Sequence, residues 1–341
     1  MIHLAGDINL TDGFFDTGFG VGTSLTKGND PYMHLNRSDN DVWIGNFEGV
    51  CANFSDKEGI YKRQFLIAPQ YLARVKHFDY YGVANNHVMQ HGKEAYREML
   101  QNLAGFGCGI FGDNIQRSVI FEHQSKKVCV LAFSERPENF SKEPLYWYCP
   151  EYLEIQKEYQ KISDSDFKIA YIHWGNEFID RPYEEQKRFA HWLVDLGFDL
   201  IVGMHPHLLQ GFECYKDKYI FYSIGNFVFN MAWEPLRYSC VVNVDLGKSE
   251  PLISYRYIHI GEDFFPKQVE ICQVPEKYRF EYLNSLLRDG VANEIYYNMV
   301  FQRMKKYRRN NWKNFIGNIG RFKSQDIQAI VRDFVYRRIK K

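Results

Sequence analysis

Residues 200–210 read Leu-Ile-Val-Gly-Met-His-Pro-His-Leu-Leu-Gln, and they join a predicted buried strand to two histidines. The run Asp199–Val202 predicts the strand, which ends at Gly203. Pro206 restricts its own backbone and favours an extended conformation for His205. In a loop directly after a strand, His205 and His207 can lie on either side of a metal ion or a metal pair. Two polar loop histidines without a function are the alternative, and partners elsewhere in the chain argue against it.

Side chains that can bind metal follow five predicted strands. These are Ile2–Gly6 with Asp7, Val42–Asn46 with Asn46 and Glu48, Phe78–Ala84 with Asn85, Asn86 and His87, Phe167–Ile172 with His173, and Asp199–Val202 with His205 and His207. The strands alternate with loops and with the helical segments Gly92–Leu103 and Glu184–Leu196, which favours an α/β domain. Because such sheets carry their sites at the carboxyl ends of strands, we expect the five groups to meet at one edge.

The chemistry of these side chains indicates a catalytic metal site. Carboxylate, amide and imidazole ligands without a thiolate suit Mn, Fe, Zn or Mg, in one or two divalent ions. Two ions ~3.5–4 Å apart would share a bridging carboxylate. A histidine that binds no metal could protonate a leaving group. Glu177 could orient His173, bind metal or remain solvated.

Composition limits the class of partner. Lys+Arg and Asp+Glu are both 42, so the formal charge of +0 argues against nucleic-acid binding by the whole chain. The seven cysteines form no CxxC pair, which argues against a disulfide framework. We see no signal peptide and no run of ~18 apolar residues. We therefore expect a cytoplasmic location, either free or peripheral at the inner membrane face.

The pattern divides the chain of 341 residues near position 275. Residues 1–274 read as the α/β domain, with an insertion at about 134–166 that covers the site or its rim. Residues 275–341 read as a basic helical appendage. Basic helices can lie on anionic membranes, and the alternative for this appendage is a helical lid packed on the domain.

Six motifs together resemble the CapA family of poly-γ-glutamate capsule biosynthesis proteins, within the calcineurin-like metallophosphoesterase superfamily. The motifs are Gly6-Asp7, Asn46-Phe47-Glu48-Gly49, Ala84-Asn85-Asn86-His87, His173-Trp174-Gly175-x-Glu177, Gly203-x-His205-Pro206-His207-x-x-Gln210 and Ser223-x-Gly225-Asn226-Phe227. The resemblance covers about Ile2 to Ile260 and leaves out the C-terminal appendage.

The resemblance implies a four-layer sandwich of two mixed sheets flanked by helices, with a dinuclear site at the strand ends. Asp7 and His207 would hold one metal, Asn86, His173 and His205 the other, and Glu48 would bridge them. His87 would be the acid, with Asn85 beside it at the catalytic position. Asn9, Asn46, Arg63, Trp174, Glu177, Gln210 and Asn226 are candidates for support of the site or for substrate contact. Asn9 stands where the superfamily usually has histidine, and Glu48 where it usually has aspartate, so we expect either one or two ions.

Two functions from different classes remain open at this point. The first is a metal-dependent hydrolase, a phosphoesterase acting on an anionic small molecule or polymer in capsule or surface-polymer synthesis. The second is a non-catalytic accessory subunit that tethers or exports a poly-γ-glutamate-like or glycan polymer. In either case the partners would be capsule-synthesis proteins or a membrane surface.

Overall fold

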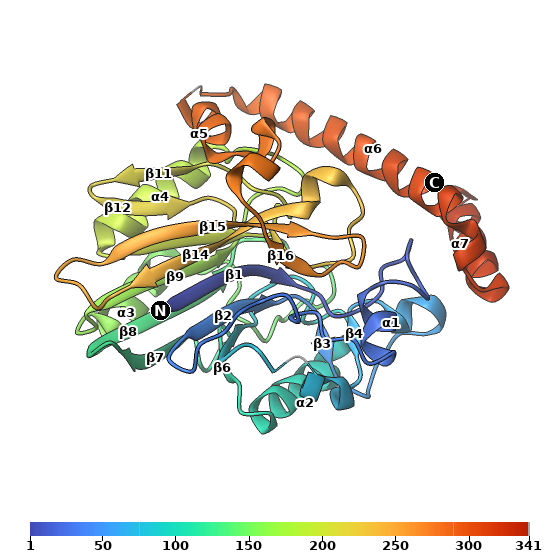
Figure 1. The fold of residues 1–341 in the computed structure, drawn as a ribbon, viewed down its shortest axis with the longest axis horizontal. Helices are drawn as coiled ribbons and strands as arrows, with labels where there is room; N and C mark the ends of the chain where they lie inside the picture. The colour runs from blue at the N-terminus through green and yellow to red at the C-terminus, as the bar shows by residue number, and fades with distance from the viewer. Residues whose placement is uncertain (75, 289, 340–341) are drawn as a thin grey trace.

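The computed structural model describes residues 1–74, 76–288 and 290–339. One sheet has the strand order β16-β15-β14-β1-β2-β5-β6, and β13 pairs with β1. Its strands are β1 (Ile2–Ile8), β2 (Val42–Phe47), β5 (Tyr80–Gly82), β6 (Gly109–Phe111), β13 (Asn226–Val228), β14 (Tyr238–Asp245), β15 (Leu252–Ile260) and β16 (Pro266–Gln268). Since β1, β2, β5 and β6 are parallel while β14–β16 are antiparallel, this sheet is mixed (Figure 1).

The second sheet has the order β11-β12-β10-β9-β8-β7 and is also mixed. Its strands are β7 (Ser118–His123), β8 (Lys126–Ser134), β9 (Phe167–His173), β10 (Leu200–Met204), β11 (Phe212–Tyr215) and β12 (Lys218–Phe221). The four central strands are parallel, and the two edge strands are antiparallel to their neighbours. The short strands β3 (Val50–Cys51) and β4 (Leu66–Ile67) form a separate pair.

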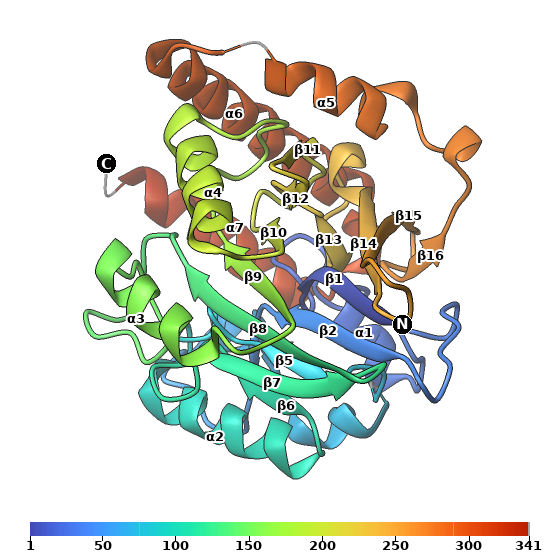
Figure 2. The same ribbon diagram turned by 90° about the vertical axis from the view of Figure 1, so that its left-hand side faces the viewer.

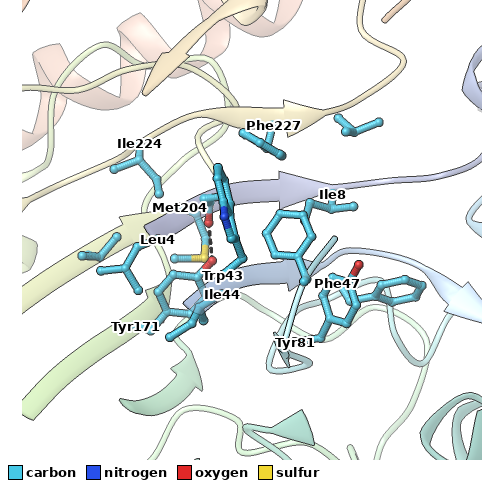
Figure 3. Close-up of a cluster of buried hydrophobic side chains, with 14 of the residues drawn as sticks. Leu4, Ile8, Trp43, Ile44, Phe47, Tyr81, Tyr171, Met204, Ile224 and Phe227 are labelled. Atoms are coloured by element: carbon cyan, nitrogen blue, oxygen red, sulfur yellow. Dashed lines mark hydrogen bonds between the residues drawn. The ribbon is translucent and has the colours of Figure 1, made fainter. Parts of the chain in front are cut away.

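The two sheets pack face to face, with helices outside them. Along β9, Ile169 and Tyr171 belong to the main core, while Ala170 and Ile172 belong to a second core under the helices. This alternation is the period of a strand that is buried on both faces. Tyr171 meets the first sheet directly, because its hydroxyl donates a hydrogen bond to the carbonyl of Ala5 (Figure 3).

Helices complete the layers. The second core is covered by α3 (Tyr152–Ile162) and α4 (Glu184–Leu196), and α2 (Gly92–Gly105) packs beside β3 and β6 (Figure 2). The predicted sandwich of two mixed sheets flanked by helices is therefore confirmed. None of the helices among the described residues is long and apolar enough to cross a bilayer.

The connections between strands contain short helical segments. The segment between residues 11 and 41 contains the helix α1 (Val21–Thr26), and Pro69–Arg74 forms 3-10 turns. The segment at 134–166 has two parts. Its second half is α3, which connects the parallel strands β8 and β9 and buries Ile155 and Ile162, as an ordinary crossover helix does. Its first half follows the end of β8 and brings the ring of Phe140 to 5.9 Å from the ring of His87.

The predicted C-terminal appendage is helical, and it comprises α5 (Phe280–Arg288), α6 (Asn293–Gly317) and α7 (Ser324–Ile339). Phe280 and Leu283 of α5 belong to the main core. Helices α6 and α7, which we call the C-terminal arm, run from α5 past the carboxyl ends of the strands (Figure 1). The boundary at 275 stays a prediction, and the packing of α5 argues for placing it near residue 290.

Candidate metal centre

Asp7 lies on β1 between the paired strands β2 and β13, and close backbone packing fixes its position. Asp7 pairs in register with Asn46 on β2 and with Asn226 on β13. A Cβ at Gly6 would lie 1.7 Å from the carbonyl oxygen of Gly225, so only glycine permits this approach of β13 to β1. The pairing of β1 with β2 and β13 therefore brings polar side chains from three strands together around Asp7.

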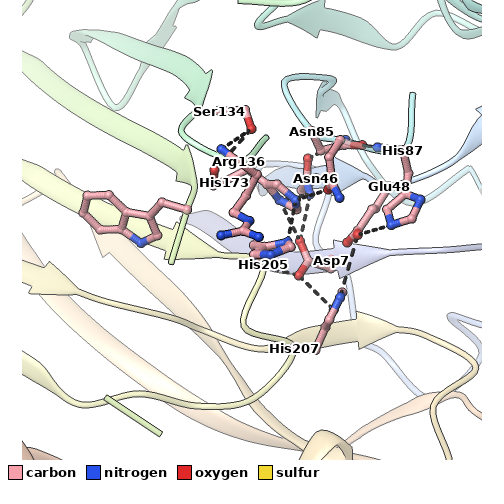
Figure 4. A network of polar contacts seen from close by, with 12 residues as sticks. Asp7, Asn46, Glu48, Asn85, His87, Ser134, Arg136, His173, His205 and His207 are labelled. Carbon is pink, nitrogen blue, oxygen red and sulfur yellow. Dashed lines mark hydrogen bonds and ion pairs between the residues drawn. The ribbon is translucent and has the colours of Figure 1, made fainter. Parts of the chain in front are cut away.

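The Asp7 carboxylate is fully buried and surrounded by donors. Oδ1 accepts a hydrogen bond of 2.7 Å from Asn46 Nδ2 and lies 3.7 Å from His173 Nδ1. Oδ2 accepts the backbone N–H of His205 at 3.1 Å and lies 3.5 Å from His207 Nδ1 (Figure 4). Burial opposes ionisation of Asp7, but the contacts with His173, His207 and Asn46 together outweigh it and hold the pKa of Asp7 below its ordinary value. Asp7 is thus a buried anion.

Glu48 follows β2 and has no such donors. Both of its carboxylate oxygens are buried without a hydrogen-bond partner, and the side chain is 0% exposed. The nearest imidazole nitrogens are His87 Nε2 at 3.7 Å and His207 Nε2 at 3.9 Å. Burial, and then the negative charge of Asp7, raises the pKa of Glu48 well above its ordinary value. A carboxylate in this position needs a compensating charge, and a bound cation would supply it.

The two histidines around Pro206 lie on opposite sides of Asp7. His205 Nδ1 lies 3.0 Å from His173 Nε2, and its own Nε2 is buried without a partner. His207 lies on the Glu48 side, where its Nδ1 is 2.9 Å from Asn226 Oδ1. Both residues have positive φ angles, 97° for His205 and 62° for His207, which non-glycine residues rarely adopt. The extended conformation predicted for His205 is therefore wrong, although both rings still lie at the cluster (Figure 4).

These residues form two overlapping groups of potential ligands. Glu48, His173 and His205 offer three ligand atoms within 4.8 Å of one another, and so do Asp7, Glu48 and His207. Glu48 belongs to both groups, and Asn86 Oδ1 lies 2.9 Å from His173 Nε2. The unpartnered atoms of Glu48 and His205, together with this donor set, fit one or two divalent cations.

His87 lies beside this cluster but in neither group of three. Its ring stacks on Phe65 with centroids 3.8 Å apart, and its Nδ1 lies 2.7 Å from Gln90 Oε1. Burial lowers the pKa of His87 to about 3. The neighbouring Asn85 donates to Asn46 Oδ1 and to the Phe47 carbonyl, while its own Oδ1 accepts the backbone N–H of His87. With these three bonds, Asn85 holds the loop that carries His87.

Several other residues that the sequence singled out form hydrogen bonds or ion pairs with other parts of the fold rather than with the cluster. Trp174 is buried under α4 and donates to the Tyr222 carbonyl, so it walls no substrate groove. Gln210 donates to the Ile179 carbonyl in the interior. Arg63 pairs with Asp326 of α7 rather than facing the cluster. Asn9 accepts hydrogen bonds from the backbone and hydroxyl of Thr11.

The other residues predicted to support the site lie close to the cluster. Asn46 and Asn226 orient Asp7 and His207 through the hydrogen bonds given above. Glu177 is half-buried, and its charge contributes to the raised pKa of Glu48.

Three residues near the cluster were missed in the sequence. Arg136, two residues after β8, adds positive charge that lowers the pKa values of His173 and His205, after the larger effect of burial. The rule that functional polar groups follow strand ends applies to Arg136 too, because it follows the end of β8. Phe178 lies 6.2 Å from the ring of His207 and stacks on Tyr307 of α6 with centroids 4.1 Å apart. The contact with Tyr307 had no sequence signal, since it joins segments 129 positions apart.

The family described as "Bacterial capsule synthesis protein PGA_cap" matches residues 2–231. The chain belongs to this family. Capsule biosynthesis protein CapA of Bacillus anthracis is 30% identical over 190 residues, which cover 50% of this chain and 44% of that protein. PGA biosynthesis protein CapA of Bacillus subtilis is 30% identical over 183 residues, which cover 49% of this chain and 46% of that protein. The chain spans less than half the length of these two relatives, and the PGA_cap match ends before the C-terminal arm.

Similar solved structures include phosphatases. A novel phosphatase from Mycoplasma pneumoniae superposes with a TM-score of 0.45 at 12% identity and covers 76% of this chain and 92% of that one. A 5'-nucleotidase from Candida albicans superposes with a TM-score of 0.46 at 12% identity and covers 91% of this chain and 58% of that one. These scores and identities are too low to support an inference about activity.

Proposed function

We propose that this PGA_cap protein is a metal-dependent phosphoesterase that acts in the synthesis of a capsule or another surface polymer. The observation that carries the proposal is Glu48, whose buried carboxylate has no hydrogen-bond partner and belongs to both groups of potential ligands. A buried anion without compensation is unfavourable, and a cation that binds there would compensate it.

Each residue then has a distinct part. Asp7 and His207 would hold one divalent ion, His173, His205 and Asn86 the other, and Glu48 would contact both. Asn46 and Asn226 would fix the orientation of Asp7 and His207 through the hydrogen bonds described above. When bound, such ions act as Lewis acids that favour the ionisation of water and neutralise charge on phosphoryl oxygens. The donors offer no thiolate, so Mn, Fe, Zn and Mg remain candidates.

His87 would supply the proton for the leaving group. Burial keeps it neutral in the free protein, since its pKa is lowered to about 3. An anionic substrate beside the ring would raise that pKa, because a nearby negative charge favours the imidazolium. Phe65 and Gln90 hold the ring in one orientation from both sides, which a proton donor requires.

The test is turnover of phosphate esters by protein that has been stripped of metal and reloaded. Phosphate monoesters and diesters with good and poor leaving groups would be assayed with Mn, Fe, Zn or Mg. The proposal predicts metal-dependent turnover of at least one ester and loss of it in Glu48→Gln. Absence of turnover with every ion, from protein that binds those ions, would contradict the proposed activity.

A non-catalytic accessory role is the second candidate. Two observations favour it: Tyr307 of the C-terminal arm stacks over Phe178 next to His207, and a relative in Mycobacterium tuberculosis, 25% identical over 166 residues, is named "Probable polyglutamine synthesis accessory protein". In that case the chain would tether a growing polymer at capsule-synthesis proteins, with the basic arm on a membrane surface. Binding of acidic vesicles or of a capsule polymer by protein that turns over no ester would support this candidate. The cytoplasmic location stays a prediction in both cases.

A further inference from the structure

Arg136 is anchored to the strand that carries His173. Ser134, the last residue of β8, pairs in register with His173, and its hydroxyl donates to the His173 carbonyl at 3.3 Å. The backbone N–H of Arg136 in turn donates to Ser134 Oγ at 3.2 Å. The backbone that presents Arg136 is therefore tied to the backbone that presents a candidate ligand.

The guanidinium group of Arg136 has hydrogen-bond acceptors but no carboxylate partner. Nη1 donates to the Gly175 carbonyl at 2.6 Å and to Asn176 Oδ1 at 3.3 Å, while Nε is buried without a partner. Within the described part of the chain, no carboxylate oxygen lies within 4.0 Å of this group, whereas Arg303 reaches Asp180 at 2.6 Å. A guanidinium offers five donors in a planar fork, and a carboxylate or phosphate oxygen pair matches that geometry.

The C-terminal arm holds the same loop from the other side. Asn176 accepts from Arg136 and donates through Nδ2 to the Tyr296 hydroxyl of α6 at 3.3 Å. Asn176 is thus a positioning residue that links the arm to Arg136. Figure 4 shows Arg136 on the His205 side of the cluster and His87 on the Glu48 side. A group bound at the cluster would therefore lie between an arginine and a histidine.

We propose that Arg136 binds an anionic oxygen of the substrate next to the metal centre and so selects substrates with a phosphate or carboxylate group beside the reacting bond. The inference rests on the proposed function, since it concerns the substrate of the same site. Glu177 acts on the charge of Arg136 from beyond ion-pair distance. The unpartnered Nε of the guanidinium, close to two histidines and to a site that fits divalent ions, can therefore still donate to an anionic oxygen of a bound group. The alternative is a purely structural tether between β8 and the 175–176 loop.

The experiment measures the binding of inorganic phosphate to metal-loaded protein by calorimetry. Arg136→Gln should raise the Kd for phosphate about 10- to 100-fold, which is the effect of losing a charge-assisted hydrogen bond. The Kd of Arg136→Lys should lie between those of wild type and Arg136→Gln, because lysine keeps the positive charge but lacks the planar fork of donors. Arg188→Gln, at a side chain on α4 that is 68% exposed, is the matched control and should bind as wild type does. Metal content and melting temperature, measured on every sample, should be unchanged in all variants.

A second probe separates this inference from the proposed activity. If no phosphate ester is turned over, but Arg136→Gln still weakens the binding of a short oligoglutamate, the phosphoesterase proposal fails while the anion-binding role of Arg136 stands. The inference is overturned if Arg136→Gln leaves the Kd of both probes unchanged. It is equally overturned if metal-loaded wild type binds neither probe, or if the variant only lowers the melting temperature.

Discussion

His87 lies 3.7 Å from Glu48 but belongs to neither group of potential ligands. We predict that His87→Gln keeps the metal content of wild type and lowers turnover of an ester with a poor leaving group by ~10²–10⁴-fold, the typical contribution of a positioned acid. Turnover of an ester with an activated leaving group should fall less, because that group needs the proton less. Rates and metal content would be measured on the same samples.

His205→Ala is the comparison for His87→Gln. His205 Nε2 is buried without a partner and belongs to a ligand group, so this variant should lose both metal and turnover. Loss of metal from His87→Gln would instead make His87 a ligand. No change in either quantity would favour the accessory role.

His77 makes the free energy of unfolding depend on pH in a way that does not involve the metal centre. Its ring packs 4.5 Å from Trp43, and burial, reinforced by Arg37, lowers its pKa from 6.5 to about 4. Between these values the unfolded chain binds a proton that the folded chain does not, so stability rises with pH, by at most ~1.4 kcal/mol per pH unit from this group. We predict that His77→Phe reduces the slope of the unfolding free energy between pH 4 and 6.5, measured by chemical denaturation. The exposed His34, changed to Gln, should leave the slope unaltered, and an unaltered slope in His77→Phe would contradict the prediction.

The candidate ligands were predictable one by one because each follows a recognisable strand. Their convergence was predictable as well, since parallel strands end at the same edge. The surroundings of Trp174 and Arg63 were not, because the first depends on packing under α4 and the second on an ion pair with a residue 263 positions away. Arg136 was missed because only side chains of the metal-ligand type were considered at the strand ends.

Helix α5 is the element that ties the C-terminal region to the domain. A Cβ at Gly211 would lie 2.8 Å from the Leu283 carbonyl oxygen, so α5 packs tightly against this part of the chain. Leu283 is 1% exposed, whereas its neighbour Tyr282 is 43% exposed. We predict that Leu283→Ala lowers the free energy of unfolding by ~2–5 kcal/mol and that Tyr282→Ala changes it by at most about 0.5 kcal/mol. Equal effects of the two variants in chemical denaturation would mean that α5 is not part of the domain core.

Long elements were easier to predict than short ones. Helix α4 has the predicted bounds, and the strand predicted over Val42–Asn46 is β2, which is one residue longer. Strands β13 and β16 have three residues each and were missed, since such short runs have no measurable period. Strand β13 nevertheless places Asn226 beside His207. The orientation of His207 therefore depends on the pairing of β13 with β1, which only the structure reveals.

The C-terminal arm packs on segments near residues 60 and 180, which lie far from it in the sequence. Phe315, Phe322 and Ile330 of this region pack with Ile60, and Arg303 pairs with Asp180. Tyr307 stacks on Phe178, which lies next to His207 (Figure 1). The arm therefore covers one approach to the metal centre rather than extending away from the domain.

We predict that this cover slows the exchange of bound metal. Tyr307→Ala should release metal to excess chelator several times faster than wild type, because it removes the ring that covers Phe178. Tyr297→Ala is the control, since that side chain of the same helix is 57% exposed. Equal release rates in wild type and both variants, followed by stopped-flow with a coloured chelator, would show that the arm does not control access to the centre.

Metal content tests the central claim most directly. Elemental analysis of protein purified without chelator should give one to two divalent ions per chain in wild type and a marked loss in Glu48→Gln. Glu185→Gln, at a side chain on α4 that is 51% exposed, should retain the wild-type content. In chelator, Glu48→Gln should be at least as stable as wild type, because it replaces a buried carboxyl group, whose ionisation burial disfavours, by a neutral amide. Wild-type protein free of metal, or Glu48→Gln loaded as fully as wild type, would contradict the assignment of these strand ends as a metal centre.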